Sequence, residues 1–144
     1  MRFFFYGTLL DRDVTALVLG RRLPPWAFEP ASLPGYSRWR VLGGSYPIAI
    51  PDRKREVAGC IVGGLSDRDV ARLAAYEGSG YRVASVKVRV AGGVTRVSVF
   101  EPLIQKLKPT NRPWDLVVWR RRDKRGFVAR LVRALNGRRG YSRP

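Results

Sequence analysis

The apolar residues of this chain fall into short runs separated by glycine, proline and charged residues, a pattern typical of short strands and helices. The first run, Phe3-Phe4-Phe5-Tyr6, consists of aromatic residues alone, so it predicts a strand buried on both faces. Gly7 favours a tight turn after that strand, of a kind that a side chain would forbid. Asp11 then predicts the N-cap of a short helix, whose apolar positions include Val14 and Val18.

Four later segments, in which apolar residues are continuous or alternate with polar ones, predict further strands. These segments are residues 36–42, 57–65, 81–90 and 94–100, with a short extended piece at 46–51. Gly92-Gly93 predicts a hairpin turn between the last two segments. Residues 21–34 are rich in proline, so we expect them to run extended over the surface, held there by Trp26 and Phe28. Residues 52–56 are expected to form a charged turn.

Caps and apolar spacing predict helices in the second half of the chain. The first follows Ser66, which is a suitable N-cap, and ends at Gly78. Its apolar face, which includes Leu73, also carries Glu77. The later helical segments are residues 113–119 and 127–135. The residues just before them, 109–113, are expected to form a loop.

The order of these elements predicts the fold class. Strands that are mostly adjacent along the chain, with a few helices between them, indicate an α+β fold. We expect a single domain with a mixed, mostly antiparallel, barrel-like sheet, because 144 residues are enough for one hydrophobic core. Residues 1–135 are expected to form this domain, and residues 136–144 are expected to form a basic, flexible C-terminal tail.

The net charge is +17, and it is concentrated toward the C-terminus. From Arg120 onward there are ten basic residues, and the only acidic residue is Asp123. Such a charge attracts polyanions without specifying one. Arginines beside the rings of Trp119 and Tyr141 could also stack on bases. Binding of nucleic acid through the arginine-rich C-terminal region therefore stays open as an alternative function.

The composition removes several classes of catalytic site. The chain has no histidine, and its one cysteine, Cys60, lies in an apolar segment. Histidine-dependent catalytic triads, histidine-ligated zinc and an internal disulfide are therefore excluded. Any proton transfer must use a carboxylate, a lysine or a tyrosine. We expect a cytoplasmic protein with no membrane partner, because no apolar run is long enough to cross a bilayer and the N-terminus lacks the pattern of a signal peptide.

Glu77 is the candidate for acid–base chemistry, because it lies on the apolar face of a helix end, between Tyr76 and Tyr81. Burial at such a place raises the pKa of a carboxyl group, whereas the nearby Arg82 lowers it. In the first segment, the turn after Tyr6 directs backbone N–H groups toward one point, which suits a carboxylate or an oxyanion. A solvated glutamate and a turn without a ligand remain the alternatives for these two segments.

The turn residues are Tyr6-Gly7-Thr8-Leu9, and the helix end reads Tyr76-Glu77-Gly78, followed by Tyr81-Arg82. The first motif is similar to the YGxL loop, and the second to the YEGxxYxR segment, of the gamma-glutamylcyclotransferase-like superfamily, which includes the avirulence-induced-gene and gamma-glutamylamine branches. Between the two motifs, similar residues stand at Gly35-Tyr36, Tyr46-Pro47 and Val57-Ala58-Gly59. The resemblance runs from about Phe3 to Phe100, and two spaced motifs in the right order are more specific than either alone.

The resemblance implies an enzyme that releases 5-oxoproline and an amine or amino acid from a gamma-glutamyl amide, by attack of the substrate's own alpha-amine. It implies Glu77 as the catalytic acid and base, and no metal or other cofactor. The substrate-binding residues that it implies are Tyr6, Gly7, Thr8, Leu9, Tyr81 and Arg82. Ala74 stands where family members commonly have aspartate, so a member that binds a gamma-glutamyl ligand without turning it over is a further alternative. The gamma-glutamyl compound and the oligomeric state are left open.

Overall fold

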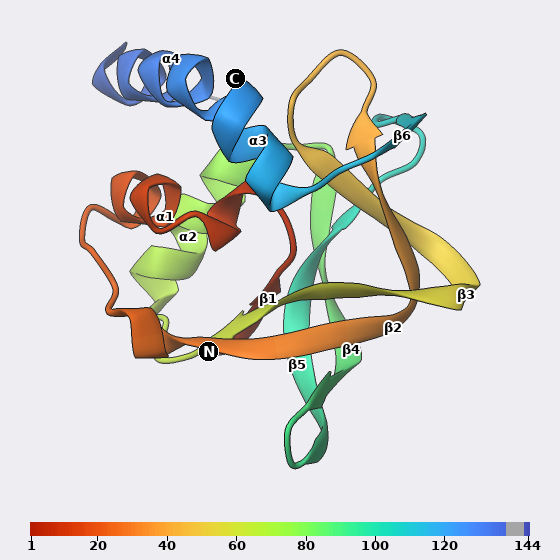
Figure 1. Cartoon of the computed structure of the whole chain (residues 1–144). Coiled ribbons are helices and arrows are strands. Elements are labelled where there is room, and N and C mark those ends of the chain that lie inside the picture. Colours follow the sequence, from red (N-terminus) through yellow and green to blue (C-terminus); the bar gives the residue numbers. More distant parts are fainter. Residues whose placement is uncertain (138–142) are drawn as a thin grey trace.

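The chain forms a curved sheet with its helices gathered on one side, and the computed structural model describes residues 1–137 and 143–144 (Figure 1). In chain order the elements are β1 (Phe3–Phe5), the 3-10 helix η1 (Thr8–Leu10), α1 (Arg12–Leu19), the 3-10 helix η2 (Pro25–Ala27), β2 (Phe28–Val41), β3 (Pro47–Val62), α2 (Asp67–Glu77), β4 (Tyr81–Val90), β5 (Gly93–Pro102), β6 (Pro109–Pro113), α3 (Leu116–Arg122) and α4 (Lys124–Gly137). Within these residues, no helix is long and apolar enough to cross a membrane.

The strands of the described part of the chain close into a barrel. Their order in the six-stranded sheet is β3-β1-β5-β4-β2-β6, and β2 also pairs with β3, so the strands from β3 to β2 form a circuit. The pairings are antiparallel except that of β1 with β5, where Phe3 lies opposite Ser98. Ser32 of β2 lies opposite Arg89 of β4. The predicted α+β domain with a mixed, mostly antiparallel, barrel-like sheet is confirmed.

The β2–β3 ribbon is longer than the sequence predicts. β3 continues through residues 52–56, where we expected a charged turn, although residues 52–55 fall at the register shift and have no partner in β2. The expected surface segment 21–34 is wrong from Phe28 onward, because Pro30 and Pro34 lie within β2. Proline interrupts the sequence pattern of a strand, but a register shift just after Pro34 is the kind of irregularity at which sheets tolerate it.

Three smaller expectations are also wrong, each for its own reason. Trp26 is 84% exposed, so it does not hold the preceding segment to the body of the protein. Residues 109–113 form β6 and not a loop, because they pair with the end of β2. The helix expected from Pro113 begins at Leu116, since the side chain of Asp115 accepts a hydrogen bond from the Val118 N–H at 2.9 Å and caps it there.

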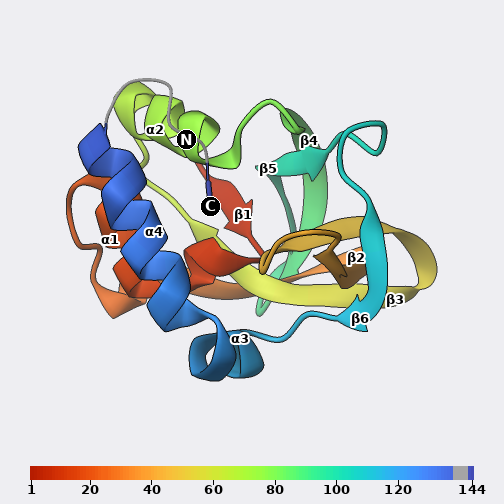
Figure 2. The same ribbon diagram turned by 90° about the horizontal axis from the view of Figure 1, so that it is seen from above.

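The hydrophobic core has two parts, and β1 contributes to both. Phe3 and Phe5 pack into a cluster shared with the helices, whereas Phe4 and Tyr6 pack into a second cluster inside the barrel. The strand predicted to be buried on both faces is therefore confirmed. Figures 1 and 2 show α1, α2 and α4 together on one side of the barrel, where they cover the first cluster.

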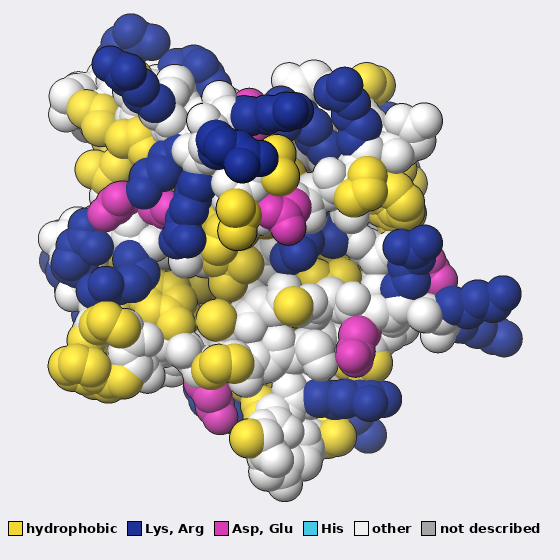
Figure 3. Space-filling model, in the orientation of Figure 1, with side chains coloured by type: hydrophobic (Ala, Val, Ile, Leu, Met, Phe, Trp, Pro, Cys, Tyr) yellow, Lys and Arg dark blue, Asp and Glu magenta, His cyan; other side chains and the backbone are white. Residues whose placement is uncertain are grey.

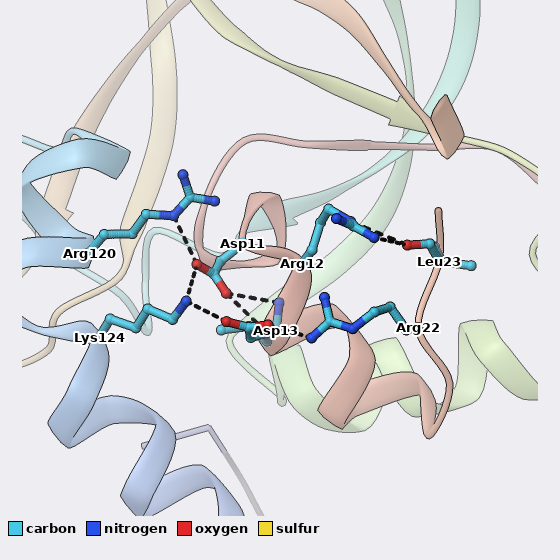
Figure 4. A network of polar contacts seen from close by, with 8 residues as sticks. Asp11, Arg12, Asp13, Arg22, Leu23, Arg120 and Lys124 are labelled. Carbon is cyan, nitrogen blue, oxygen red and sulfur yellow. Dashed lines mark hydrogen bonds and ion pairs between the residues drawn. The ribbon is translucent and has the colours of Figure 1, made fainter. Parts of the chain in front are cut away.

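A buried carboxylate joins the N-terminal helix to the C-terminal ones (Figure 4). One oxygen of Asp11 accepts hydrogen bonds from the N–H groups of Asp13 and Val14, which confirms the predicted N-cap of α1. Its other oxygen lies 2.9 Å from both the Arg120 Nε and the Lys124 Nζ. Because Arg120 belongs to α3 and Lys124 to α4, this network fixes three helices relative to one another.

Candidate active site

α2 places Glu77 at its last position. Ser66 and Asp69 form a capping box, in which each side chain accepts a hydrogen bond from the other residue's N–H. Gly78 ends the helix with a φ of 84°, in the left-handed region that favours glycine. Tyr76, the residue before Glu77, is fully buried. The predicted helix, its cap and its end are confirmed, and they carry Glu77 to the edge of the core.

The end of β1 and the start of η1 form the other half of the site. A Cβ atom on Gly7 would lie 2.9 Å from the Pro47 Cγ, so the close approach of Pro47 requires glycine here. The φ of Gly7 is −128°, which means that space, and not the unusual turn that we expected, explains this residue. The Arg38 Nη1 donates a hydrogen bond to the Tyr6 carbonyl oxygen at 2.9 Å and holds the backbone of the turn in place.

Buried hydrogen bonds join the two halves. The Thr8 Oγ1 and the Tyr76 hydroxyl lie 2.5 Å apart, and both residues are almost completely buried. The Tyr81 hydroxyl donates to the Pro47 carbonyl oxygen at 3.3 Å. The residues from the two sequence motifs are therefore in direct contact, although 68 positions separate Thr8 from Tyr76.

These segments line one cavity. It contains six residues of the predicted site, which are Tyr6, Gly7, Thr8, Leu9, Glu77 and Tyr81. Its other lining residues are Phe4, Phe5, Pro47, Phe100 and Arg143. The free volume is about 20 Å³, which is room for about one water molecule.

Arg82, the remaining residue of the predicted site, does not line this cavity. Its side chain is 64% exposed, and its Nη2 donates to the Glu101 Oε1 at 3.3 Å. Successive side chains of a strand point to opposite faces, so the inward position of Tyr81 at the start of β4 turns Arg82 toward solvent. Contact of Arg82 with a ligand in this cavity is therefore not supported by its position.

Arg143 provides the positive charge beside Glu77 that we expected from Arg82. The Arg143 Nη1 donates to the Glu77 Oε2 at 2.8 Å, and the two side chains are only 5% and 10% exposed. Burial raises the pKa of Glu77 above its ordinary value, and the Arg143 guanidinium partly opposes this shift. A carboxyl group with a raised pKa is suited to accept a proton and to return it near neutral pH.

The hydroxyls of the tyrosines around Glu77 stay protonated near neutral pH. Burial raises the pKa of the Tyr6, Tyr76 and Tyr81 hydroxyls well above the ordinary value, so all three are neutral near pH 7. The Tyr6 hydroxyl also donates to the Phe100 carbonyl oxygen at 3.1 Å. Proton exchange in the cavity therefore depends on Glu77. Among the described residues, no group of acidic, cysteine or histidine side chains is arranged to hold a metal ion.

The fold, and the contact between the residues of the two motifs, agree with the family that the sequence matches. Residues 3–119 match the family described as "Gamma-glutamyl cyclotransferase, AIG2-like". The chain belongs to this family. Among its relatives is AIG2-like protein A of Arabidopsis thaliana, which is 31% identical over 133 residues that cover 87% of this chain and 75% of that protein.

Two solved structures have a similar fold. A solution structure of an Arabidopsis thaliana protein superposes with a TM-score of 0.66 at 30% identity, and covers 90% of this chain and 86% of that chain. A structure named gamma-glutamyl cyclotransferase has a TM-score of 0.55 at 19% identity, over 70% of this chain and 65% of that chain. The second likeness concerns the fold alone.

Ala74 and Arg143 both bear on the candidate site. Ala74, which stands where the resemblance implies an aspartate, is exposed on α2 and does not line the cavity. Arg143 lies beyond residue 119, where the match to the gamma-glutamyl cyclotransferase family ends. No sequence motif indicated Arg143, because a lone arginine in a basic region has no distinguishing pattern. Pro47, by contrast, belongs to the Tyr46-Pro47 pair that the resemblance had included.

Proposed function

We propose that this protein is a gamma-glutamylcyclotransferase-like enzyme that converts a gamma-glutamyl amide into 5-oxoproline and an amine or amino acid. The observation that carries the proposal is the position of Glu77. Its carboxyl group is buried in the cavity that Gly7, Thr8 and Leu9 also line, and burial raises its pKa. Membership of the gamma-glutamyl cyclotransferase, AIG2-like family supports the reaction class.

The first chemical step forms the ring. Glu77 removes a proton from the substrate's alpha-ammonium group, and the resulting amine attacks the side-chain carbonyl carbon. A carbon–nitrogen bond forms, and the carbonyl oxygen takes the negative charge. Because the nucleophile and the carbonyl belong to one molecule, holding the substrate in a folded conformation supplies much of the acceleration.

The second step releases the amine. The tetrahedral intermediate collapses, the original amide bond breaks, and Glu77 gives its proton to the departing nitrogen. The Glu77 carboxylate then takes the second proton from the ring nitrogen, which leaves a neutral lactam, and passes it to the released amine, which departs as an ammonium ion. No water, metal or covalent enzyme intermediate enters this balance. We assign substrate binding to the residues of the Tyr6–Leu9 turn that line the cavity. The neutral Tyr81 side chain forms part of the wall of the same cavity.

The test is the release of 5-oxoproline from a panel of gamma-glutamyl dipeptides, gamma-glutamyl-epsilon-lysine and glutathione. Turnover of at least one compound supports the proposal and identifies the leaving amine. If several of these compounds bind, and none is turned over, the protein is instead a non-catalytic gamma-glutamyl-ligand-binding member of the family. If none binds or reacts, the proposed substrate class is wrong.

Nucleic-acid binding is a second candidate, and the charged surface favours it. Lys and Arg side chains gather over α3 and α4 in Figure 3. A groove of about 590 Å³ there is lined by four cationic residues from α3, α4 and the segment after α1, namely Arg22, Arg120, Lys124 and Arg125, and also by Asp13, Ala16, Leu17 and Val128. Arg138, Arg139 and Tyr141, which the sequence also suggested, lie outside the described residues. A steep loss of affinity for mixed oligonucleotides with rising salt, reduced in an Arg120→Gln/Arg125→Gln variant, is the expected result.

A further inference from the structure

Arg143 lies in the cavity that contains Glu77. It is far from this site in sequence and beyond the last helix, yet it lines the cavity together with Phe5 and Thr8. Figures 1 and 2 both show the C-terminus near the end of α2. The Arg143 side chain is only 5% exposed, so it is inserted into the site and does not lie over its entrance.

The surroundings of Arg143 form a site for a planar cation. The centre of its guanidinium lies 3.6 Å from the centroid of the Tyr46 ring, and 5.0 and 5.1 Å from those of Tyr81 and Tyr76. Rings at such distances attract a cation through their π-electrons, more strongly where water is excluded. Glu77 accepts a hydrogen bond from Arg143 at 2.8 Å and completes the site with a negative charge.

The cavity cannot hold Arg143 and a gamma-glutamyl group together. With Arg143 in place, the remaining volume of about 20 Å³ admits about one water molecule. In the proposed reaction, the substrate's alpha-ammonium group must reach the Glu77 carboxylate, and the Arg143 Nη1 already occupies a hydrogen-bonding position on that carboxylate. Both groups are cations that approach the same carboxylate in a cavity with little free volume, so they compete for it.

The contact is also incomplete, which allows it to be displaced. The Arg143 Nε is buried without a hydrogen-bond partner among the described residues. Leaving a buried donor unpaired costs free energy, and this loss favours release of the side chain into water. A guanidinium with all its donors satisfied would be held more tightly, so the unpaired Nε lowers the cost of exchanging Arg143 for another cation.

We propose that the Glu77 cavity is a cation-binding site, that Arg143 of the same chain occupies it at rest, and that the ammonium group of a gamma-glutamyl substrate binds only after displacing Arg143. The first part stands on the cage of tyrosines and the carboxylate alone. The second part rests on the proposed function, because it identifies the competing cation as that of the substrate.

The binding test uses methylguanidinium, the head group of an arginine side chain, as the probe. Chemical shifts of the tyrosine rings are followed by NMR in the wild type, in Arg143→Gln and in Arg133→Gln. Arg133 is exposed on α4, so its variant removes the same charge from the same region and serves as the matched control. We expect saturable shifts in Arg143→Gln at a concentration at least about tenfold lower than in the wild type or the control, because removing the internal competitor raises the fraction of open site.

Equal binding of methylguanidinium by the wild type and Arg143→Gln would show that Arg143 does not occupy the site. Absence of binding in Arg143→Gln would show that the cavity does not recognise a cation. If Arg143→Gln does not fold, as judged by its thermal unfolding, Arg143→Lys keeps the charge and loses the planar stacking. It should bind the probe with an intermediate affinity, and wild-type behaviour would contradict the proposal.

Kinetics separate this inference from the proposed function. With a gamma-glutamyl substrate, we expect Arg143→Gln to lower KM at least about tenfold relative to Arg133→Gln. Turnover with an unchanged KM would overturn the displacement of Arg143 and leave the proposed reaction intact. Absence of turnover in every variant would count against the proposed reaction, whereas the methylguanidinium titration would still decide whether Arg143 occupies a cation site.

Discussion

The hydrogen bond between Thr8 and Tyr76 joins the two motifs of the candidate site, and replacing Tyr76 by phenylalanine removes it. The Tyr76 side chain is fully buried, and Thr8 is 2% exposed. The two oxygens lie 2.5 Å apart. Tyr76→Phe keeps the ring but leaves the Thr8 hydroxyl buried without this partner, and Thr8→Val leaves the Tyr76 hydroxyl in the same state.

The size of the effect depends on whether one or both partners of the hydrogen bond are removed. A buried group that loses its partner costs about 1–3 kcal/mol of unfolding free energy, whereas replacing both partners by apolar groups of similar shape is nearly neutral. Each single variant should therefore lose about 2 kcal/mol, and the double variant should lose about 1–2 kcal/mol less than the sum of the two. For a chain of this length, 2 kcal/mol corresponds to about 4–8 °C in the melting temperature.

The assay is urea unfolding at pH 7, followed by tryptophan fluorescence for the wild type, both single variants and the double variant. Tyr36→Phe is the matched control, because Tyr36 is only partly buried, and we expect it to stay within about 0.5 kcal/mol of the wild type. If Tyr76→Phe behaves like this control, or if the two single effects add in the double variant, the bond does not couple the two motifs.

Two further predictions concern the network around Asp11. Asp11→Asn keeps a capping side chain and loses the charge that Arg120 and Lys124 contact, so it should lower the free energy of unfolding by about 1 kcal/mol. Asp11→Ala loses the cap as well and should lower it by about 2 kcal/mol. Equal losses in urea unfolding would contradict the role of Asp11 as the N-cap. Hydrogen bonds from Lys124 and Arg22 lower the pKa of Asp13 to about 2, and those from Lys124 and Arg120 lower the pKa of Asp11 although burial opposes them. Because these folded-state values lie below the unfolded ones, their stabilisation is present above about pH 4 and is lost as the pH falls toward 2. The urea midpoint should therefore fall less between pH 5 and pH 2.5 in Asp11→Asn than in the wild type, and parallel curves would refute this.

Local patterns predicted the elements that carry the candidate site. Asp11 and Ser66 act as the predicted caps, Gly78 ends its helix, and the strand from Tyr81 has the predicted bounds. These features depend on residues close together in sequence, whose backbone hydrogen bonds and side-chain periodicity can be anticipated. The same periodicity placed Glu77 on the buried face of its helix, where it lies.

Features that depend on distant partners were missed. Prolines at 30 and 34 indicated a surface segment, but β3 offers β2 a long partner that stabilises the strand in spite of them. The assignment of Arg82 had a different cause, because it was carried over from the resemblance to the YEGxxYxR segment, whose arginine falls one position later, at Val83, and strand alternation turns Arg82 toward solvent. Arg143 contacts Glu77 from 66 positions away in the sequence. No local pattern contains that information.

The measurement that tests the central claim most directly is the rate of 5-oxoproline release by Glu77→Gln, compared with the wild type and with Glu101→Gln. Glutamine has nearly the same shape as glutamate but cannot accept and return a proton, and Glu101 is a carboxylate outside the cavity. We predict that Glu77→Gln retains the wild-type fold by circular dichroism and loses at least about 100-fold in kcat, while Glu101→Gln keeps its rate. A folded Glu77→Gln protein with a wild-type rate would contradict the assignment of Glu77 as the general acid and base.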